Sequence, residues 1–469
     1  MRGRMQKIDN HLSTWSQKNR AEPEGYVGGQ TFVGMITNNL TDTNTRVDGL
    51  LEQLLDRQNL NTAYLQVVGN RGAGGIDKMG VESLGDYLRE HKEHLLVSIK
   101  QGDYSPAPVR RVEIPKDNGS KRMLGIPTVV DRLIQQGISQ ILTPIYEPEF
   151  SDRSYGFRPG RNAHQALINC REYIEKGYKY AVDMDLEKFF DTVNHSKLIE
   201  LLSRKIKDGR LISLIHRYLR AGVEINGRIT VTTEGVPQGG PLSPLLSNIM
   251  LDELDKELES RGHKFVRYAD DLMILCRSKR SALRVMESIT KFVERKLKLK
   301  VNKEKSIVSH VSKIKFLGYS FYNYRGESRL RIHPKSLGKM KAKIKGLTCR
   351  SRGWSDEQRI LYLREYLTGW MHYFKLADMG TKLGHLDMWY RRRLRMVKWK
   401  QWKHSKSKIK NLVQLGASKY KAYEWAHTWK SYWHTAKSWI LTTTLSNDYL
   451  KQLGYPSLLA EYTRVRVTT

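Results

Sequence analysis

Two adjacent aspartates, Asp270 and Asp271, lie between the short apolar runs 265–268 and 272–275. Apolar runs on both sides of a brief polar break are typical of a β-hairpin, so both acids are expected at its tip. Adjacent carboxylates repel each other, and a bound cation relieves that repulsion. For an Asp-Asp pair taken alone, a solvated turn is the simpler explanation.

A second acidic residue at a predicted strand end lies upstream, where Asp185 directly follows the run 181–184 and begins a turn. In an antiparallel sheet this residue could meet the hairpin tip and complete a cage of carboxylates, with Leu186 offering its backbone carbonyl. Transfer from a nucleoside triphosphate needs two divalent cations about 4 Å apart, one at the attacking hydroxyl and one at the pyrophosphate. We therefore interpret Asp185, Asp270 and Asp271 as catalytic and, with Leu186, as ligands of two Mg²⁺ ions.

The charge of the chain points to a polyanionic partner. Its 469 residues include 81 Lys or Arg and 48 Asp or Glu, which gives a net charge of +33. No apolar run reaches the roughly 18 residues that a membrane span requires, and residues 1–20 lack a signal-peptide core. We expect a cytoplasmic protein without a membrane partner. The three cysteines, Cys170, Cys276 and Cys349, are too far apart to predict a disulfide framework or a four-ligand zinc site.

The pattern along the chain predicts an α+β fold. Residues 1–46 are polar and are expected to be an N-terminal extension, whereas helical spacing begins at Leu50, Leu51, Leu54 and Leu55. Further on, helical stretches alternate with short β-rich runs, namely 109–114, 180–184, 229–233 and 265–268. After about residue 330 the β-rich runs fade, which predicts a helical C-terminal region.

Three segments, in this order, resemble the palm motifs of reverse transcriptases: Phe189-Phe190-Asp191, Pro237-Gln238-Gly239 and Tyr268-Ala269-Asp270-Asp271. More specifically, the chain resembles the group II intron reverse transcriptase/maturase family, and this likeness also rests on segments 74–77, 122–127, 155–159, 235–244 and 316–319. The resemblance implies a right-hand polymerase with an antiparallel palm sheet. Its expected parts are fingers and palm at 47–320, a thumb/maturase region at 321–410, and a small basic helical DNA/RNA-binding region at 411–469.

The resemblance assigns several residues to the incoming nucleotide. Phe190 would lie under the sugar, where its ring would clash with a 2′-hydroxyl and so favour deoxynucleotides. Lys116 and Arg122 would place two cations over the triphosphate. Gln238 would support the nucleotide or the template by hydrogen bonding.

Other assignments leave alternatives open. Lys305 is similar to the lysine thought to protonate the leaving pyrophosphate, although Lys303 is a rival and a plain surface lysine explains either residue as well. Arg158 lies in a segment where the family holds the template. The segment that resembles the primer grip consists of Phe316, Leu317, Gly318 and Tyr319.

The C-terminal part is rich in tryptophan and cations. Nine of the ten tryptophans lie at or beyond Trp354, and residues 391–410 contain ten Lys or Arg and no acid. Cations contact phosphates and aromatic rings stack on bases, which predicts a nucleic-acid surface. Its proposed residues are Arg391, Arg392, Arg393, Arg395, Lys398 and Lys400. Trp425, Trp429 and Trp433 recur every four residues as on one helix face, where packing in a core is favoured over base stacking.

The family often carries a zinc-supported endonuclease at its C-terminus, but no pair of cysteines follows Cys349. The chain therefore resembles the bacterial, endonuclease-lacking subset. The expected function is RNA-directed DNA synthesis from deoxynucleotides on an RNA template with a DNA primer. The expected second role is binding of the intron RNA, to assist splicing, and of target DNA. The alternatives are an RNA-binding splicing factor without polymerase activity and a domesticated enzyme of defence or DNA repair.

Overall fold

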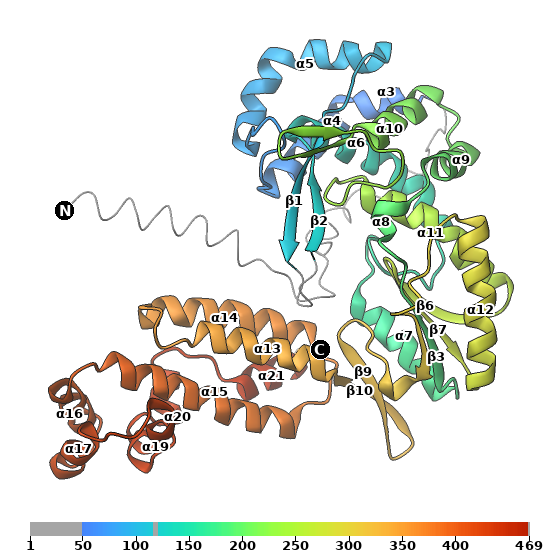
Figure 1. Cartoon of the computed structure of the whole chain (residues 1–469). Coiled ribbons are helices and arrows are strands. Elements are labelled where there is room, and N and C mark those ends of the chain that lie inside the picture. Colours follow the sequence, from blue (N-terminus) through green and yellow to red (C-terminus); the bar gives the residue numbers. More distant parts are fainter. Residues whose placement is uncertain (1–48, 116–120, 468–469) are drawn as a thin grey trace. The chain divides into compact units, whose positions relative to one another are not determined.

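The computed structural model of the chain describes residues 49–115 and 121–467. These residues fall into two compact units, an N-terminal unit that ends at Ile314 and a C-terminal unit that begins at Lys315 (Figure 1). Across both described ranges, every helix is too short or too polar to span a bilayer. Each unit is considered by itself below.

The N-terminal unit mixes helices and strands, as the sequence predicted. Its strands are β1 (Val109–Pro115), β2 (Lys121–Ile126), β3 (Tyr180–Met184), β4 (Val223–Ile225), β5 (Arg228–Thr230), β6 (Lys264–Tyr268), β7 (Asp271–Cys276) and β8 (Ile307–His310). Its helices are α3 (Leu50–Leu55), α4 (Arg57–Gly69), α5 (Leu84–Gln101), α6 (Val129–Tyr146), α7 (Ala163–Glu175), α8 (Phe189–Thr192), α9 (His195–Lys205), α10 (Gly209–Arg220), α11 (Ser243–Ser260) and α12 (Lys279–Lys296). Short 3₁₀ turns cover Val81–Ser83, Glu147–Glu149 and Val311–Lys313.

One antiparallel sheet, in the order β6-β7-β3-β8, forms the base of the candidate site. Helix α12 packs on β3, β7 and β8, while α7 packs on β6 and β7 (Figure 1). Both helices begin at a side-chain cap, because the Ser278 hydroxyl accepts from the Ser281 amide and Asn162 forms a capping box with Gln165. The covered strands β6 and β7 are buried along nearly all their length, which explains why most of their residues are apolar.

A second sheet has the order β2-β1-β4-β5. The β-rich run expected at 229–233 is only partly a strand in the structure, where β5 covers Arg228–Thr230. Asn226 and Gly227 both adopt positive φ, which suits the tight turn between β4 and β5. Just beyond the strand, the Thr232 hydroxyl donates to the Leu219 carbonyl and draws the chain toward the end of α10.

The C-terminal unit is largely helical, which confirms the expected change after residue 330. It opens with a hairpin of β9 (Tyr319–Tyr324) and β10 (Glu327–Ile332). Helices α14 and α15 both pack on α21 (Figure 1). Helix α15 also contacts α18. The helices are α13 (Pro334–Leu347), α14 (Asp356–Tyr373), α15 (Gly380–Gln401), α16 (Ser405–Gln414), α17 (Lys419–Ala426), α18 (Tyr432–Thr435), α19 (Trp439–Thr444), α20 (Asn447–Gln452) and α21 (Leu458–Val467).

The expected single helix face of Trp425, Trp429 and Trp433 is wrong. Helix α17 ends before Trp429, and α18 begins after it. The break has a local cause, because the Ser431 hydroxyl accepts from the His434 amide and so favours a new helix start. Trp429 thus lies outside both helices, and its side chain is exposed.

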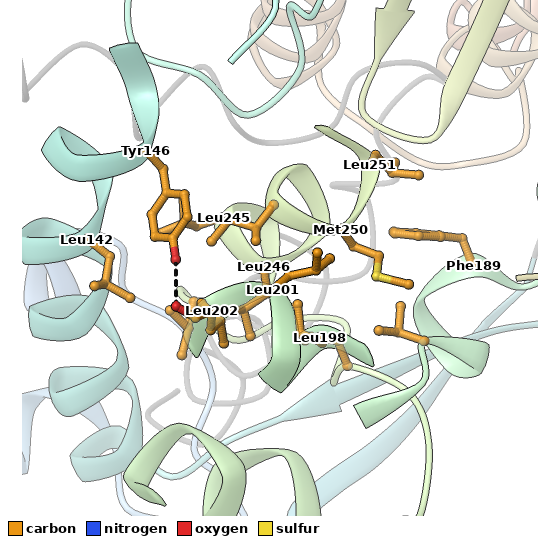
Figure 2. Close-up of a cluster of buried hydrophobic side chains, with 14 of the residues drawn as sticks. Leu142, Tyr146, Phe189, Leu198, Leu201, Leu202, Leu245, Leu246, Met250 and Leu251 are labelled. Carbon is orange, nitrogen blue, oxygen red and sulfur yellow. Dashed lines mark hydrogen bonds between the residues drawn. The ribbon is translucent and has the colours of Figure 1, made fainter. Parts of the chain in front are cut away.

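The main core of the N-terminal unit joins helices that are distant in sequence. Figure 2 shows Met250 of α11 between Phe189 and Leu198, with the Tyr146 hydroxyl donating to the Leu202 carbonyl. All five residues are buried. Helices α6, α9 and α11 therefore meet in a common apolar layer behind the short helix α8.

A buried ion pair fixes α11 to the sheet. The guanidinium of Arg267 on β6 contacts Asp255 on α11, with its Nε 2.8 Å from Oδ1, and both side chains are almost completely buried. Arg267 also donates to the Asn248 side chain and to the Ala269 carbonyl, at 3.0 and 2.9 Å. Because each buried charge has a partner, the desolvation of both groups is offset. The network ends at the hairpin that carries Asp270.

We predict that Met250→Ala lowers the free energy of unfolding by about 2–5 kcal/mol, because it leaves a cavity that the rigid helices fill only in part. The matched variant Met250→Leu keeps the volume and should cost less than about 1.5 kcal/mol. Chemical denaturation followed by circular dichroism measures both. Equal effects of the two variants would contradict the packing described here.

We predict that Asp255→Asn destabilises the protein by about 3–5 kcal/mol, since it leaves the Arg267 charge buried without a counter-ion. Glu257→Gln is the matched control, because Glu257 lies on the same helix as Asp255 but pairs with Arg261 at the surface. That control should cost about 1 kcal/mol or less. Thermal unfolding tests both, and a similar melting shift for the two variants would argue against the role of the buried pair.

Candidate active site

The two adjacent aspartates lie at a tight hairpin. Tyr268 of β6 pairs with Asp271 of β7, so that Ala269 and Asp270 form the two-residue turn between them. Ala269 has a φ of 57°, a left-handed conformation that costs an alanine roughly 1 kcal/mol or more. The Ala269 carbonyl is held by Arg267, and the surrounding contacts maintain this conformation.

The chain around Gly156 supports the other side of the turn. A Cβ at Gly156 would lie 2.1 Å from the Ala269 nitrogen, so that only glycine fits there without a shift of the backbone. The Tyr155 amide donates to the Arg267 carbonyl at 2.9 Å, and the Asn248 side chain donates to the Gly156 carbonyl at the same distance. The segment 155–159 that the sequence singled out therefore holds the hairpin in place.

Asp185 meets the hairpin through the register of the sheet. Met184 of β3 pairs with Leu272 of β7, so the next residues, Asp185 and Asp271, face each other where the ladder ends. Opposed residues in an antiparallel pair have Cα atoms about 4.5–5.5 Å apart and point to the same face. The backbone of Asp185 is itself fixed, because its carbonyl accepts from the Asn302 amide at 2.8 Å.

The charge of Asp270 is influenced by its surroundings. Burial raises the pKa of Asp270, and the nearby carboxylate of Asp185 raises it further, whereas the positive charges of Arg122 and Arg267 oppose this shift. Asp185 and Asp270 are thus close enough to repel each other. Arg122 of β2, predicted to hold the triphosphate, is near enough to act on the same carboxylate.

The three aspartates provide ligand types suited to Mg²⁺, a hard cation that prefers carboxylate and carbonyl oxygens. Among residues 49–115 and 121–467, no three acidic, histidine or cysteine side chains converge into a ready-made metal site. The carboxylates thus share one edge of the sheet without closing around a common point. Leu186 is buried and forms an antiparallel bridge with Val301, which fixes its backbone beside Asp185.

Lys305 lies beside the predicted metal ligands. Its ammonium is 3.6 Å from Oδ2 of Asp185, and the two side chains are 61% and 38% exposed. A pair so open to solvent contributes about 1 kcal/mol or less to stability. The structure thus brings this cation to the carboxylates, whereas its role toward pyrophosphate stays a prediction.

Phe190 and Gln238 are brought together by one loop. Phe189 is buried and packs edge-on against the half-buried Phe190, with ring centroids 5.1 Å apart. The Phe190 carbonyl accepts from the Val236 amide at 2.6 Å, and the Gln238 carbonyl accepts from the Gly125 amide of β2 at 2.7 Å. Residues 235–240 therefore connect the predicted sugar gate to the strand that carries Arg122. Lys116, the other predicted triphosphate contact, lies outside the described residues.

The Arg158 side chain is buried and makes internal contacts. Its guanidinium contacts Glu147 and donates to the backbone carbonyls of Ser151 and Ser154 at 2.5 and 2.9 Å. This arginine therefore stabilises the loop that leads to Gly156. Its expected contact with the template stays a prediction.

The segment 316–319 forms a tight turn in the C-terminal unit. The Phe316 amide donates to the Tyr319 carbonyl at 3.0 Å, and the Tyr319 amide donates to the Phe316 carbonyl at 2.9 Å. Leu317 and Gly318 between them have positive φ. Phe316, Leu317 and Tyr319 are buried, and the Gly318 carbonyl accepts from the Ser336 hydroxyl at 2.9 Å. Because these side chains face the core, a primer could contact only the backbone of this turn.

The cations predicted to bind nucleic acid on α15 mostly make internal contacts. Arg392 donates to the Trp433 carbonyl at 2.7 Å, and Arg395 donates to the Leu445 carbonyl at 2.9 Å. The other internal contacts join Arg391 to Asp387, Arg393 to Thr348 and Lys398 to Asp356. Lys400 is exposed, with its ammonium 5.3 Å from the Tyr432 ring centre. The charges of α15 thus join neighbouring helices, and their contact with nucleic acid stays a prediction.

Sequence reasoning missed the residues that position the site. Arg267 was visible as a lone charge inside an apolar strand, which is a signal for a buried partner, but nothing in the sequence identified Asp255 as that partner. His195 was missed as well. It is buried, its Nε2 lies 2.7 Å from the Gly235 carbonyl, and burial lowers its pKa. His195 thus fixes the start of the loop that carries Gln238.

Two family descriptions match the chain. "Reverse transcriptase (RNA-dependent DNA polymerase)" covers residues 114–321, and "Group II intron, maturase-specific domain" covers residues 337–416. The first stretch contains strand β3 and the hairpin of the candidate site. The second contains most of α13 and the helices α14, α15 and α16.

Three curated relatives are similar to this chain over more than half of its length. "Protein YkfC" of Escherichia coli (strain K12) is 31% identical over 334 residues, which is 62% of this chain and 88% of that protein. "Group II intron-encoded protein LtrA" of Lactococcus lactis subsp. cremoris is 34% identical over 324 residues, which is 55% of this chain and 54% of the relative. "Putative COX1/OXI3 intron 2 protein" of Saccharomyces cerevisiae is 29% identical over 347 residues, 61% of this chain and 40% of that protein.

The chain thus spans most of YkfC but only about half of LtrA. The expected α+β fold with fingers and palm, followed by a helical maturase region, is confirmed by the two matched stretches and the observed elements. Except for segment 74–77, the motifs that carried the resemblance lie within the stretch matched as reverse transcriptase. The chain belongs to the group II intron reverse transcriptase/maturase family.

Proposed function

We propose that the protein copies RNA into DNA, with Asp185, Asp270 and Asp271 as its catalytic carboxylates. The observation that carries this proposal is the register of the sheet, which brings Asp185 opposite Asp271 with Asp270 in the adjoining turn. A solvated Asp-Asp turn would need neither the third carboxylate nor the buried network behind it.

The proposed cofactor is a pair of Mg²⁺ ions held by the three carboxylates and the Leu186 carbonyl. When bound, such ions lower the pKa of the primer hydroxyl and neutralise the charge of the departing pyrophosphate. The protein's own groups position and complement that chemistry. Lys305, beside Asp185, provides a proton and a positive charge for the pyrophosphate, while Arg122 binds the phosphates of the nucleotide.

Deoxynucleotides are the proposed substrates, and Phe190 selects them. The Phe190 ring packs against Phe189 on one side, and the bond from the Val236 amide to the Phe190 carbonyl fixes the backbone that carries the ring. An apolar ring offers a 2′-hydroxyl no hydrogen bond, and the desolvation of the hydroxyl is left uncompensated.

The proposed nucleic-acid partners are an RNA template with a DNA primer, the intron RNA and target DNA. The maturase-specific match at 337–416 supports binding of intron RNA to assist splicing. The net charge of +33 suits a large polyanion.

We predict that Asp270→Ala reduces DNA synthesis by about a thousandfold or more, since a lost ligand removes several kcal/mol of charge stabilisation in the transition state. RNA affinity should change little. Primer extension on an RNA template, with Mg²⁺ present or chelated, measures the first effect, and filter binding measures the second.

Asp86→Ala is the matched control for Asp270→Ala, because Asp86 is an exposed aspartate paired with Arg89 on α5. It should leave both readouts unchanged. Tight RNA binding without DNA synthesis by the unaltered protein would instead favour a splicing factor without polymerase activity. A loss of RNA affinity alone in Asp270→Ala would refute the site assignment.

We predict that Phe190→Val lowers the preference for deoxynucleotides over ribonucleotides by roughly tenfold or more, the usual range for removing steric exclusion. Phe190→Tyr keeps the bulk and should keep the preference. Single-nucleotide extension with each type of triphosphate measures the ratio of kcat/KM. An unchanged ratio in Phe190→Val would remove Phe190 from the sugar site.

A further inference from the structure

Three large aromatic side chains are exposed around helix α17. The side chains of Tyr420 and Tyr423 are 77% and 63% exposed, and Trp429, in the turn that follows the helix, is 93% exposed. Larger groups of exposed apolar side chains mark interaction sites on folded proteins. The three residues therefore call for an explanation other than packing of the C-terminal unit.

The fold of α17 does not depend on these rings. Ala422 and Ala426 are buried on the opposite side of the helix, and Ala422 belongs to the same small core as Leu412 of α16. Trp425 packs partly against that core and adds to it. Helix α17 is thus held by one face, which leaves the other face free.

The exposed face has a regular spacing of rings. Tyr420, Tyr423 and His427 are separated by three and four residues, so they follow one side of the helix. The rings of Tyr423 and His427 are already close, with centroids 4.4 Å apart and planes tilted by 42°. The tyrosines are spaced along the helix so that further flat rings could stack on them.

The charge around this face is almost entirely positive. Residues 401–446 contain eight lysines and one acid, Glu424. That acid is bonded to Lys421 at 2.8 Å. Lys421 also lies 5.6 Å from the ring centre of Tyr420, and Lys430 follows Trp429 directly. A polyanion is therefore the partner that complements this surface.

We propose that α17 and the turn after it bind unpaired nucleotides of a single nucleic-acid strand. Bases stack on Tyr420, Tyr423 and Trp429, and the stacking surface is defined by these three residues. The exposed lysines that flank them in the sequence, Lys419 and Lys430, contact the phosphates. This inference rests on the proposed function and specifies one of its nucleic-acid partners as unpaired.

A single strand fits better than a duplex because stacking on a protein ring requires the face of a base, which a continuous duplex keeps covered. An anionic membrane is a less suitable partner. Interfacial helices present a broad apolar face to lipid, whereas the apolar face of α17 is occupied by its own core.

The surface lies beyond both matched stretches, since the maturase-specific match ends at residue 416 and α17 begins at Lys419. Neither family match therefore accounts for the exposed rings. In the C-terminal unit, the cations of α15 that the sequence favoured are mostly engaged within the protein, whereas Lys419 and Lys430 are exposed. The proposed contact on α17 lies within the region 411–469 that the resemblance marks as DNA/RNA-binding, and it uses side chains that the fold leaves exposed.

The test uses the full-length protein and a fluorescently labelled 12-nucleotide thymidine strand, with a 12-base-pair duplex as the comparison. We predict that replacing Tyr420, Tyr423 and Trp429 together by Leu weakens single-strand binding by at least about tenfold, in line with the loss of base stacking. Duplex binding should change less than about threefold, and the salt dependence of single-strand binding should keep its slope, because no phosphate contact is removed.

Two matched variants separate the contribution of the aromatic rings to single-strand binding from that of the lysine charges. Replacing the same three residues by Phe keeps a ring at each position and should preserve single-strand affinity within about threefold. Lys419→Gln with Lys430→Gln should instead flatten the salt dependence by about 0.7 per lysine that contacts a phosphate of the single strand. Thermal unfolding of each variant checks that the exposed substitutions leave the fold intact.

A strand containing 5-iodouridine locates the contact directly, because the polymerase site also binds single strands. Photocrosslinks to Tyr420, Tyr423 or Trp429 support the proposal, and crosslinks confined to the N-terminal unit overturn it. Loss of binding to phosphatidylglycerol vesicles in the Leu variant, with unchanged single-strand binding, would overturn it in favour of a membrane surface.

The same measurements separate this inference from the proposed polymerase. A protein that extends primers normally, yet binds the single strand equally well after the Leu substitutions, refutes the stacking surface alone. A protein that makes no DNA but loses single-strand binding in the Leu variant refutes the polymerase proposal alone.

Discussion

The candidate site depends on one buried interaction, the ion pair between Arg267 and Asp255. A guanidinium without water needs a carboxylate and good geometry, and here it also donates to the Asn248 side chain and the Ala269 carbonyl. Through these bonds a helix, a strand and a turn take fixed positions relative to one another. The strained conformation of Ala269 and the repulsion between Asp185 and Asp270 are both tolerated because this framework holds the hairpin.

Local patterns in the sequence predicted much of the N-terminal unit. Apolar runs located β3 and β6 to within a residue, and the break between two runs located the hairpin of Asp270. What could not be predicted were partners distant in the chain. Asp255 looks like any helix acid, and the close approach of Gly156 to Ala269 is a property of the folded backbone. Periodicity also failed where a cap intervened, since Ser431 starts a new helix between Trp429 and Trp433.

The C-terminal unit shows that basic sequence and basic surface are different properties. The ten cations of 391–410 suggested an open polyanion-binding face, yet most of the arginines on α15 donate to backbone carbonyls of other segments, and Arg391 pairs with Asp387 of the same helix. Arginine suits this use, because its planar group reaches several acceptors at once. The lysines of α17 carry fewer charges in total, but those charges face solvent beside exposed rings. Surface charge therefore has to be judged from hydrogen-bond partners rather than from composition.

The contacts around Asp185 have a consequence for synthesis of the protein on the ribosome. The Asp185 amide donates to the Ser306 hydroxyl, a residue 121 positions later, and its carbonyl accepts from Asn302. A nascent chain that has not yet exposed residues 302–306 therefore cannot hold this carboxylate in place, even when β3 and β7 have emerged. Assembly of the site falls late in translation, when nearly all of the N-terminal unit has left the exit tunnel. A nascent chain therefore lacks a complete set of positioned carboxylates until its synthesis has passed this point.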